Sequence, residues 1–82
     1  MTIAAPLVYI QQKGFTQKFE NNANGQPVYV GQARPGTATS ADTWSICAFT
    51  YDSKGAVTDI KWADSTADFI KQWDDRATYT YA

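Results

Sequence analysis

Hydrophobic and polar residues alternate most regularly over residues 43–63, where two runs of aromatic and β-branched residues flank residues 52–55. Such residues favour pleated, half-buried strands. Asp52, at the first turn position, can accept hydrogen bonds from the backbone, and Gly55, at the fourth, can adopt a positive φ. The pattern therefore predicts a β-hairpin closed by a type I turn with a glycine bulge.

A bulge at Gly55 predicts the register of this hairpin. The expected pairs are Tyr51 with Val57, Phe49 with Asp59, Ala48 with Ile60, and Ile46 with Trp62. Because side chains alternate along a strand, one face is then apolar and forms the core. This core face comprises Trp44, Ile46, Ala48, Ile60 and Trp62.

The opposite face of the hairpin mixes aromatic and charged groups. It comprises Cys47, Phe49, Tyr51, Val57, Asp59 and Lys61. Another part of the same chain could cover it. Alternatively, it forms a contact surface for another subunit, since interface cores favour aromatic residues and have a polar rim. We expect Phe49, Tyr51 and Val57 at such an interface.

Shorter patterns predict further strands before this hairpin. Residues 7–12 read as a strand that begins after Pro6, where a missing N–H costs least. Residues 15–19 and 28–30 read as a second hairpin, joined through the tight-turn signal Asn24-Gly25.

After residue 63 the apolar spacing becomes helical. Phe69, Ile70 and Trp73 share one side of a short helix predicted over residues 66–73, with an extended segment as the alternative, and Phe69 and Trp73 are assigned to the core. Residues 77–81 predict a final strand that presents Tyr79 and Tyr81 to a partner. The whole chain predicts one mainly β domain over residues 1–82. Its expected form is a small antiparallel β-sandwich or barrel-like sheet with one short helix near the C-terminus.

Composition narrows the classes of function. The net charge is −1 and the seven basic residues are scattered, which disfavours nucleic-acid binding. Cys47 is the only cysteine and histidine is absent, so no disulfide, thiolate metal cluster or imidazole catalysis is expected. The start lacks a signal peptide and no apolar run approaches a membrane span, so we expect a soluble protein made in a cytosol.

No group of residues predicts catalysis or a cofactor. Asp74 and Asp75 are adjacent, and neighbouring carboxylates in a strand point to opposite faces. We interpret one as a capping group and the other as the ion-pair partner of Arg76. The three tryptophans could stack on sugars, but all fall on predicted core faces. The chain is therefore predicted not to be an enzyme.

From Val28 onward the chain resembles a group of small proteins of tailed bacteriophages. The resemblance is carried by Tyr29-Val30-Gly31, by residues 35–40, by Trp44, Ile46, Thr50-Tyr51, Trp62-Ala63-Asp64 and Phe69, and by residues 73–77 with Thr80-Tyr81. Related segments resemble modules of phage tail and fibre proteins. The resemblance implies a virion location and carries no catalytic residues with it.

These observations lead to a functional expectation. The protein is expected to be a non-enzymatic virion component that docks on larger neck, tail or fibre proteins through sheet edges and aromatic patches, as part of a symmetric oligomer. Capsid decoration is one alternative. A carbohydrate- or receptor-binding module, with a host glycan as ligand, is another.

Overall fold

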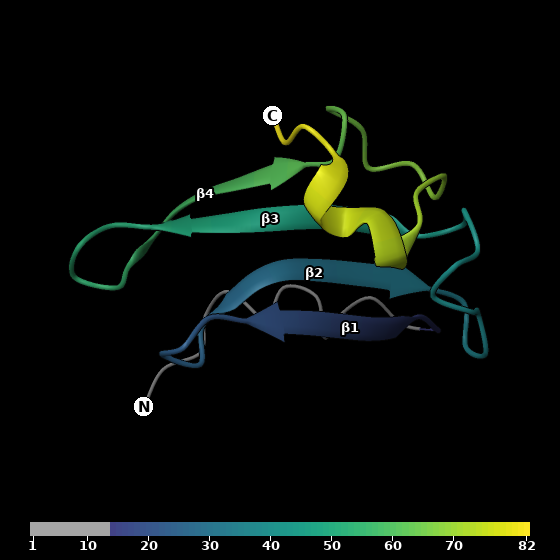
Figure 1. Ribbon diagram of the computed structural model, residues 1–82, viewed down its shortest axis with the longest axis horizontal. Coiled ribbons are helices and arrows are strands. Elements are labelled where there is room, and N and C mark those ends of the chain that lie inside the picture. The colour runs from purple at the N-terminus through teal and green to yellow at the C-terminus, as the bar shows by residue number, and fades with distance from the viewer. Residues whose placement is uncertain (1–13) are drawn as a thin grey trace.

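The protein forms one antiparallel sheet of four strands in the order β1-β2-β3-β4 (Figure 1). The computed structural model describes residues 14–82, so the strand predicted for residues 7–12 lies outside the described part. The strands are β1 (Thr16–Asn21), β2 (Pro27–Ala33), β3 (Ser45–Tyr51) and β4 (Val57–Trp62), and a 3-10 helix follows at Trp73–Thr78. A mainly β fold with a short helix near the C-terminus is thus confirmed.

Both predicted hairpins are present, and each closes with a glycine in the left-handed region. The Gly25 N–H donates to the Asn22 carbonyl at 3.0 Å, and the Gly55 N–H donates to the Asp52 carbonyl at 3.1 Å. Their φ angles are 79° and 86°, which a side chain would disfavour. The predicted glycine-bulge turn at residues 52–55 is therefore confirmed.

The β3–β4 hairpin has the same turn as the β1–β2 hairpin, thirty positions further along the chain. Asn22 Oδ1 accepts from two backbone N–H groups at 2.9 and 3.0 Å, and Asp52 Oδ1 accepts from two at 2.9 and 3.0 Å. Each hairpin also has an irregularity in register at equivalent places, between Glu20 and Asn21 and between Thr50 and Tyr51. The Gln26 side chain joins the turns, since its Nε2 donates to the Gly55 carbonyl at 3.0 Å.

This second irregularity makes the predicted register of β3 and β4 wrong beyond its first pair. Tyr51 pairs with Val57 as expected, but the register then shifts by one residue. The observed pairs are Thr50 with Asp59, Phe49 with Ile60, Ala48 with Lys61, and Cys47 with Trp62. A one-residue shift moves side chains to the other face of a sheet. Ile60 and Trp62 therefore share a face with Phe49 and Cys47, not with Ile46.

One face of the sheet is covered by the C-terminal part of the chain, with the 3-10 helix lying across β2 and β3 (Figure 1). The buried cluster on this face comprises Ala33, Trp44, Ile46, Ala63 and Trp73, against which Tyr29, Tyr79 and Tyr81 pack. The Trp44 and Trp73 rings are in contact, with centroids 5.9 Å apart. Two of the three tryptophans thus form the centre of this cluster.

The other face has its own buried cluster. It comprises Val30, Cys47 and Phe49, with Tyr51 and Trp62 packed against it. Two residues predicted to be core are instead substantially exposed, Ile60 and Phe69, each at 40%. Ile60 lies on β4, which is an edge strand of the sheet that residues 14–82 form, so no described strand covers one of its flanks.

The predicted helix over residues 66–73 is wrong. Asp64 and Ser65 adopt positive φ angles of 51° and 62°, and the segment up to residue 72 is irregular. Lys71 is instead tied to Trp44 by two backbone hydrogen bonds of 2.8 and 2.9 Å, and the 3-10 helix begins only at Trp73. The predicted final strand over residues 77–81 is reduced to an isolated bridge between Ala63 and Tyr81.

Candidate functional site

The outer edge of β4 is open before Trp62 in the part of the chain that the structure describes. The Ala63 N–H donates to Ile46 of β3, whereas both backbone groups of Trp62 bond outward to Ala82 at 3.0 and 3.1 Å. Because backbone groups alternate in direction along an antiparallel strand, those of Ile60 also point outward. Within residues 14–82, no backbone or side chain bonds to this edge before Trp62. Such an open edge can accept another strand.

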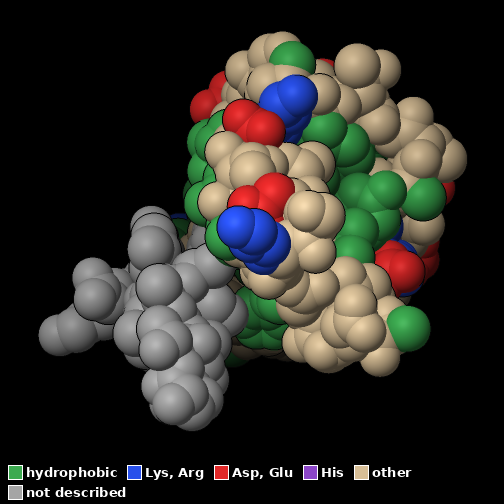
Figure 2. Space-filling model, turned by 90° about the vertical axis from the view of Figure 1, so that its left-hand side faces the viewer, with side chains coloured by type: hydrophobic (Ala, Val, Ile, Leu, Met, Phe, Trp, Pro, Cys, Tyr) green, Lys and Arg blue, Asp and Glu red, His purple; other side chains and the backbone are tan. Residues whose placement is uncertain are grey.

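Several large apolar side chains reach the surface. They are Phe19, Ile60 and Phe69 at 40%, Val57 at 39% and Ile70 at 56% exposure. Val57 and Ile60 belong to β4, so apolar side chains accompany its open edge. The end of the molecule with the two hairpin turns shows hydrophobic side chains between charged ones (Figure 2).

The three hairpin residues expected at an interface differ in their exposure. Val57 is exposed, but Phe49 is buried at 3% and belongs to the interior, which corrects the expectation for that residue. Tyr51 is half-buried and its hydroxyl donates to the Pro27 carbonyl. Burial also raises the pKa of Tyr51 above its ordinary value. Of the three, only Val57 remains available to a partner over much of its surface.

Tyr79 and Tyr81 are also less available than expected, because both pack on the core cluster. The Tyr79 hydroxyl accepts from the Gln72 N–H at 2.8 Å, and the Tyr81 hydroxyl donates to the Arg76 carbonyl at 2.6 Å. Burial raises the pKa of Tyr81 well above its ordinary value, and the neighbouring Tyr29 and Tyr79 add to this effect. Both tyrosines fasten the C-terminal segment to the sheet.

Two ion pairs involve the C-terminal segment. Lys71 Nζ lies 2.6 Å from Asp64 Oδ2, and the hydrogen bond from Lys71 holds the pKa of Asp64 below its ordinary value. Arg76 Nε lies 2.7 Å from Glu20 Oε1, and its guanidinium lies 4.6 Å from the centre of the Trp73 ring. The expected pairing of Arg76 with a neighbouring aspartate is therefore wrong. The partner comes from β1.

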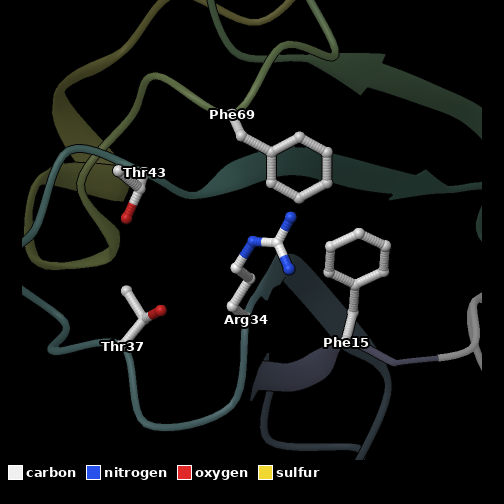
Figure 3. Close-up of a pocket in the computed structure, with 5 residues that line it drawn as sticks. All are labelled: Phe15, Arg34, Thr37, Thr43 and Phe69. Atoms are coloured by element: carbon white, nitrogen blue, oxygen red, sulfur yellow. The ribbon is translucent and has the colours of Figure 1, made fainter.

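A pocket of about 360 Å³ lies beside the end of β2 (Figure 3). Its lining comprises Phe15, Arg34, Thr37, Thr43 and Phe69. The Phe15 and Phe69 rings are stacked, with centroids 5.1 Å apart and planes inclined by 20°. The Arg34 guanidinium points toward these rings, and the two threonines lie on the other side of its side chain (Figure 3). One cation, two hydroxyls and two aromatic rings therefore converge on one hollow.

Sequence reasoning missed this pocket. Its residues come from separate segments, which the hairpin register and the irregular segment after β4 bring together. No spacing of residue types along the chain marks them as neighbours. The only available signal was an isolated arginine next to the Pro35-Gly36 turn.

Among residues 14–82, no group of three or more His, Cys, Asp or Glu side chains is arranged to hold a metal ion. No helix in the described range has the length and apolar character needed to cross a lipid bilayer. Comparison with known proteins finds no family model, curated protein or solved structure that matches the chain.

Proposed function

We propose that this protein is a non-enzymatic structural component of a bacteriophage virion, which docks on larger neck, tail or fibre proteins. The observation that carries the proposal is the open edge of β4, whose outward backbone groups at Ile60 lie beside exposed apolar side chains. An extended segment of a partner can add to such an edge as a further strand. The resemblance from Val28 onward supports the virion as the place where this happens.

The mode of docking follows from the hydrogen bonds already present on this edge. Ala82 bonds to Trp62, so the edge of β4 is already paired with another segment of the chain at the C-terminal end of the strand. A partner strand would continue this pairing along Ile60 and cover the exposed Val57 and Ile60 side chains. Main-chain bonds would then supply affinity, and these side chains would supply specificity.

Mass spectrometry of purified virions tests the location. The protein should be present in a fixed stoichiometric ratio to the tail or capsid proteins, and its absence from intact particles would refute the proposal. Dissociated neck, tail and head fractions then separate docking on the tail from capsid decoration, since the protein should remain with the substructure to which it is bound.

Variants at Ile60 test the edge itself. Ile60→Pro removes an N–H that points away from β3, so the hydrogen bonds to β3 stay intact. Proline is tolerated at such positions on edge strands. Ile60→Ala keeps the N–H and removes most of the side chain. If the edge docks by strand addition, Ile60→Pro reduces incorporation into particles more strongly than Ile60→Ala, while both variants remain folded by circular dichroism. Equal incorporation of both variants and the unchanged protein would contradict docking through this edge.

A further inference from the structure

The pocket at the end of β2 contains a cationic side chain that has no polar partner among residues 14–82. The backbone carbonyl of Arg34 accepts from the Thr37 N–H at 3.1 Å, but its guanidinium makes no hydrogen bond or ion pair with any residue in the described range, whereas the side chains of Arg76 and Lys71 are both paired. Arg34 is exposed, and its guanidinium is directed toward the stacked phenyl rings (Figure 3). A guanidinium is a permanent planar cation that binds carboxylates through two parallel hydrogen bonds. This position therefore favours a ligand with a carboxylate.

The aromatic part of the pocket favours a ligand with an apolar face. Phe69 is 40% exposed although it stacks on Phe15, so its remaining surface is available to a bound molecule. Exposed aromatic rings bury flat, weakly polar groups such as the C–H face of a sugar ring. A carboxylate alone would leave this surface uncovered.

The threonines add groups that match hydroxyls. Thr37 and Thr43 both line the pocket, and each hydroxyl can donate one hydrogen bond and accept others. A cavity of 360 Å³ lies at the lower end of the size range of small-molecule sites, about 300–1,000 Å³. The space therefore suits a small hydroxylated ligand.

We propose that this pocket binds a saccharide that carries a carboxylate. Arg34 binds the carboxylate, Thr37 and Thr43 bind ring hydroxyls, and Phe69 packs against the C–H face of the sugar. The pocket shares no residue with the open edge of β4, so this inference is independent of the docking role proposed above.

Nuclear magnetic resonance with the full-length, isotope-labelled protein tests the proposal. The probes are methyl glucuronide and methyl N-acetylneuraminide, each at about 20 mM, well above a dissociation constant of about 1 mM. We expect at least one of them to shift the backbone amide signals of Thr37 and Thr43. Methyl glucoside, which lacks the carboxylate, and acetate and glutamate, which lack the sugar ring, should bind at least about tenfold more weakly.

Three variants assign the roles of the side chains. Arg34→Gln and Phe69→Ala should each weaken binding by about tenfold or more. Lys54→Gln removes the same charge from an exposed hairpin turn and should leave binding unchanged. The same spectra report whether each variant is folded. All three residues lie outside the two buried clusters.

Several outcomes would overturn the proposal. If neither acidic sugar shifts the two threonine signals, the pocket is not a saccharide site. If methyl glucoside binds as tightly as the acidic sugars, Arg34 does not bind a carboxylate of the ligand. Equal binding of glutamate would reassign the pocket to an acidic protein side chain.

Discussion

Trp73 lies directly on Gly31, so that a Cβ atom at residue 31 would come within 2.6 Å of Trp73 Cε3 and 2.8 Å of Cζ3. Gly31 sits in the middle of β2, paired with Lys18 on one side and Ile46 on the other. The absence of a side chain there allows the indole ring to approach the backbone of the sheet. The position of the 3-10 helix on this face depends on that contact.

Gly31→Ala should therefore destabilise the protein by about 1–3 kcal/mol, the usual cost of overpacking a filled core. Urea unfolding followed by circular dichroism measures the change. Repeating the substitution in a Trp73→Leu background provides the control, because the two ring atoms nearest to the new methyl are then gone and only the looser contact with Trp44 Cε3, at 3.1 Å, remains. An equal cost in both backgrounds would show that the glycine is needed for another reason.

The two hairpin turns make a matched pair for substitution. Asp52→Ala removes an acceptor of two backbone N–H groups and should cost about 1 kcal/mol. Asp52→Asn should be close to neutral, since Asn22 makes the equivalent bonds through its side-chain carbonyl. Thermal unfolding at neutral pH compares the variants. A large loss in Asp52→Asn would mean that the charge, rather than the acceptor, is required.

The ion pair of Asp64 and Lys71 predicts a dependence of stability on acid. The pKa of Asp64 is lowered in the folded protein, chiefly by its hydrogen bond from Lys71, so the unfolded chain binds this proton more tightly. The contribution to stability is present above the ordinary aspartate pKa of about 3.9 and is lost as the pH falls through the folded-state value. Lys71→Gln should raise the pKa of Asp64 in a carboxyl titration by nuclear magnetic resonance.

Asp64→Asn serves as the companion variant, because asparagine tolerates the positive φ of 51° at this position. Its thermal midpoint should fall less steeply with acidification than that of the unchanged protein. A parallel fall in both proteins would show that Asp64 does not contribute to the acid response.

The raised pKa of Tyr81 predicts that the protein loses stability at alkaline pH. Burial raises this pKa, so the folded protein favours the neutral phenol. Stability from this group is complete below the ordinary tyrosine pKa of about 10 and is lost as the pH rises above it. Spectrophotometric titration of tyrosinate should show that Tyr81 resists ionisation more strongly than Tyr51, whose pKa is also raised by burial. In Tyr81→Phe the more resistant group should be missing, and the decline in stability above this pH should be shallower.

The alternation of apolar and polar residues was sufficient to predict the hairpins, but it did not predict which side chains of β3 and β4 share a face of the sheet. Asp52 and Gly55 define the turn, and the first strand pair follows from it. The irregularity between Thr50 and Tyr51 then shifts every later pair by one residue. No residue type in β4 indicates this shift. The sequence shows only that the two hairpins share the spacing from Asn22 or Asp52 to a glycine; the equivalent irregularity beside Glu20 is seen in the structure alone.

The helix predicted over residues 66–73 failed for a different reason. The spacing of Phe69, Ile70 and Trp73 suggested a single buried face, but Phe69 and Ile70 remain 40% and 56% exposed. Helical periodicity indicates a helix only when the apolar residues share a core. Here Trp73 alone is in the core, and the positive φ of Asp64 and Ser65 redirects the chain before it.

The repeated hairpin design has a consequence for the order of folding. Each hairpin is closed by a local turn, whose side-chain acceptor bonds to residues within four positions of itself. Contacts that are close in sequence form quickly, because little chain entropy is lost in closing them. We expect both hairpins to form early and to join along β2 and β3. We expect Trp73 to pack on Gly31 last, so that folding ends when the C-terminal segment covers a sheet that has already formed.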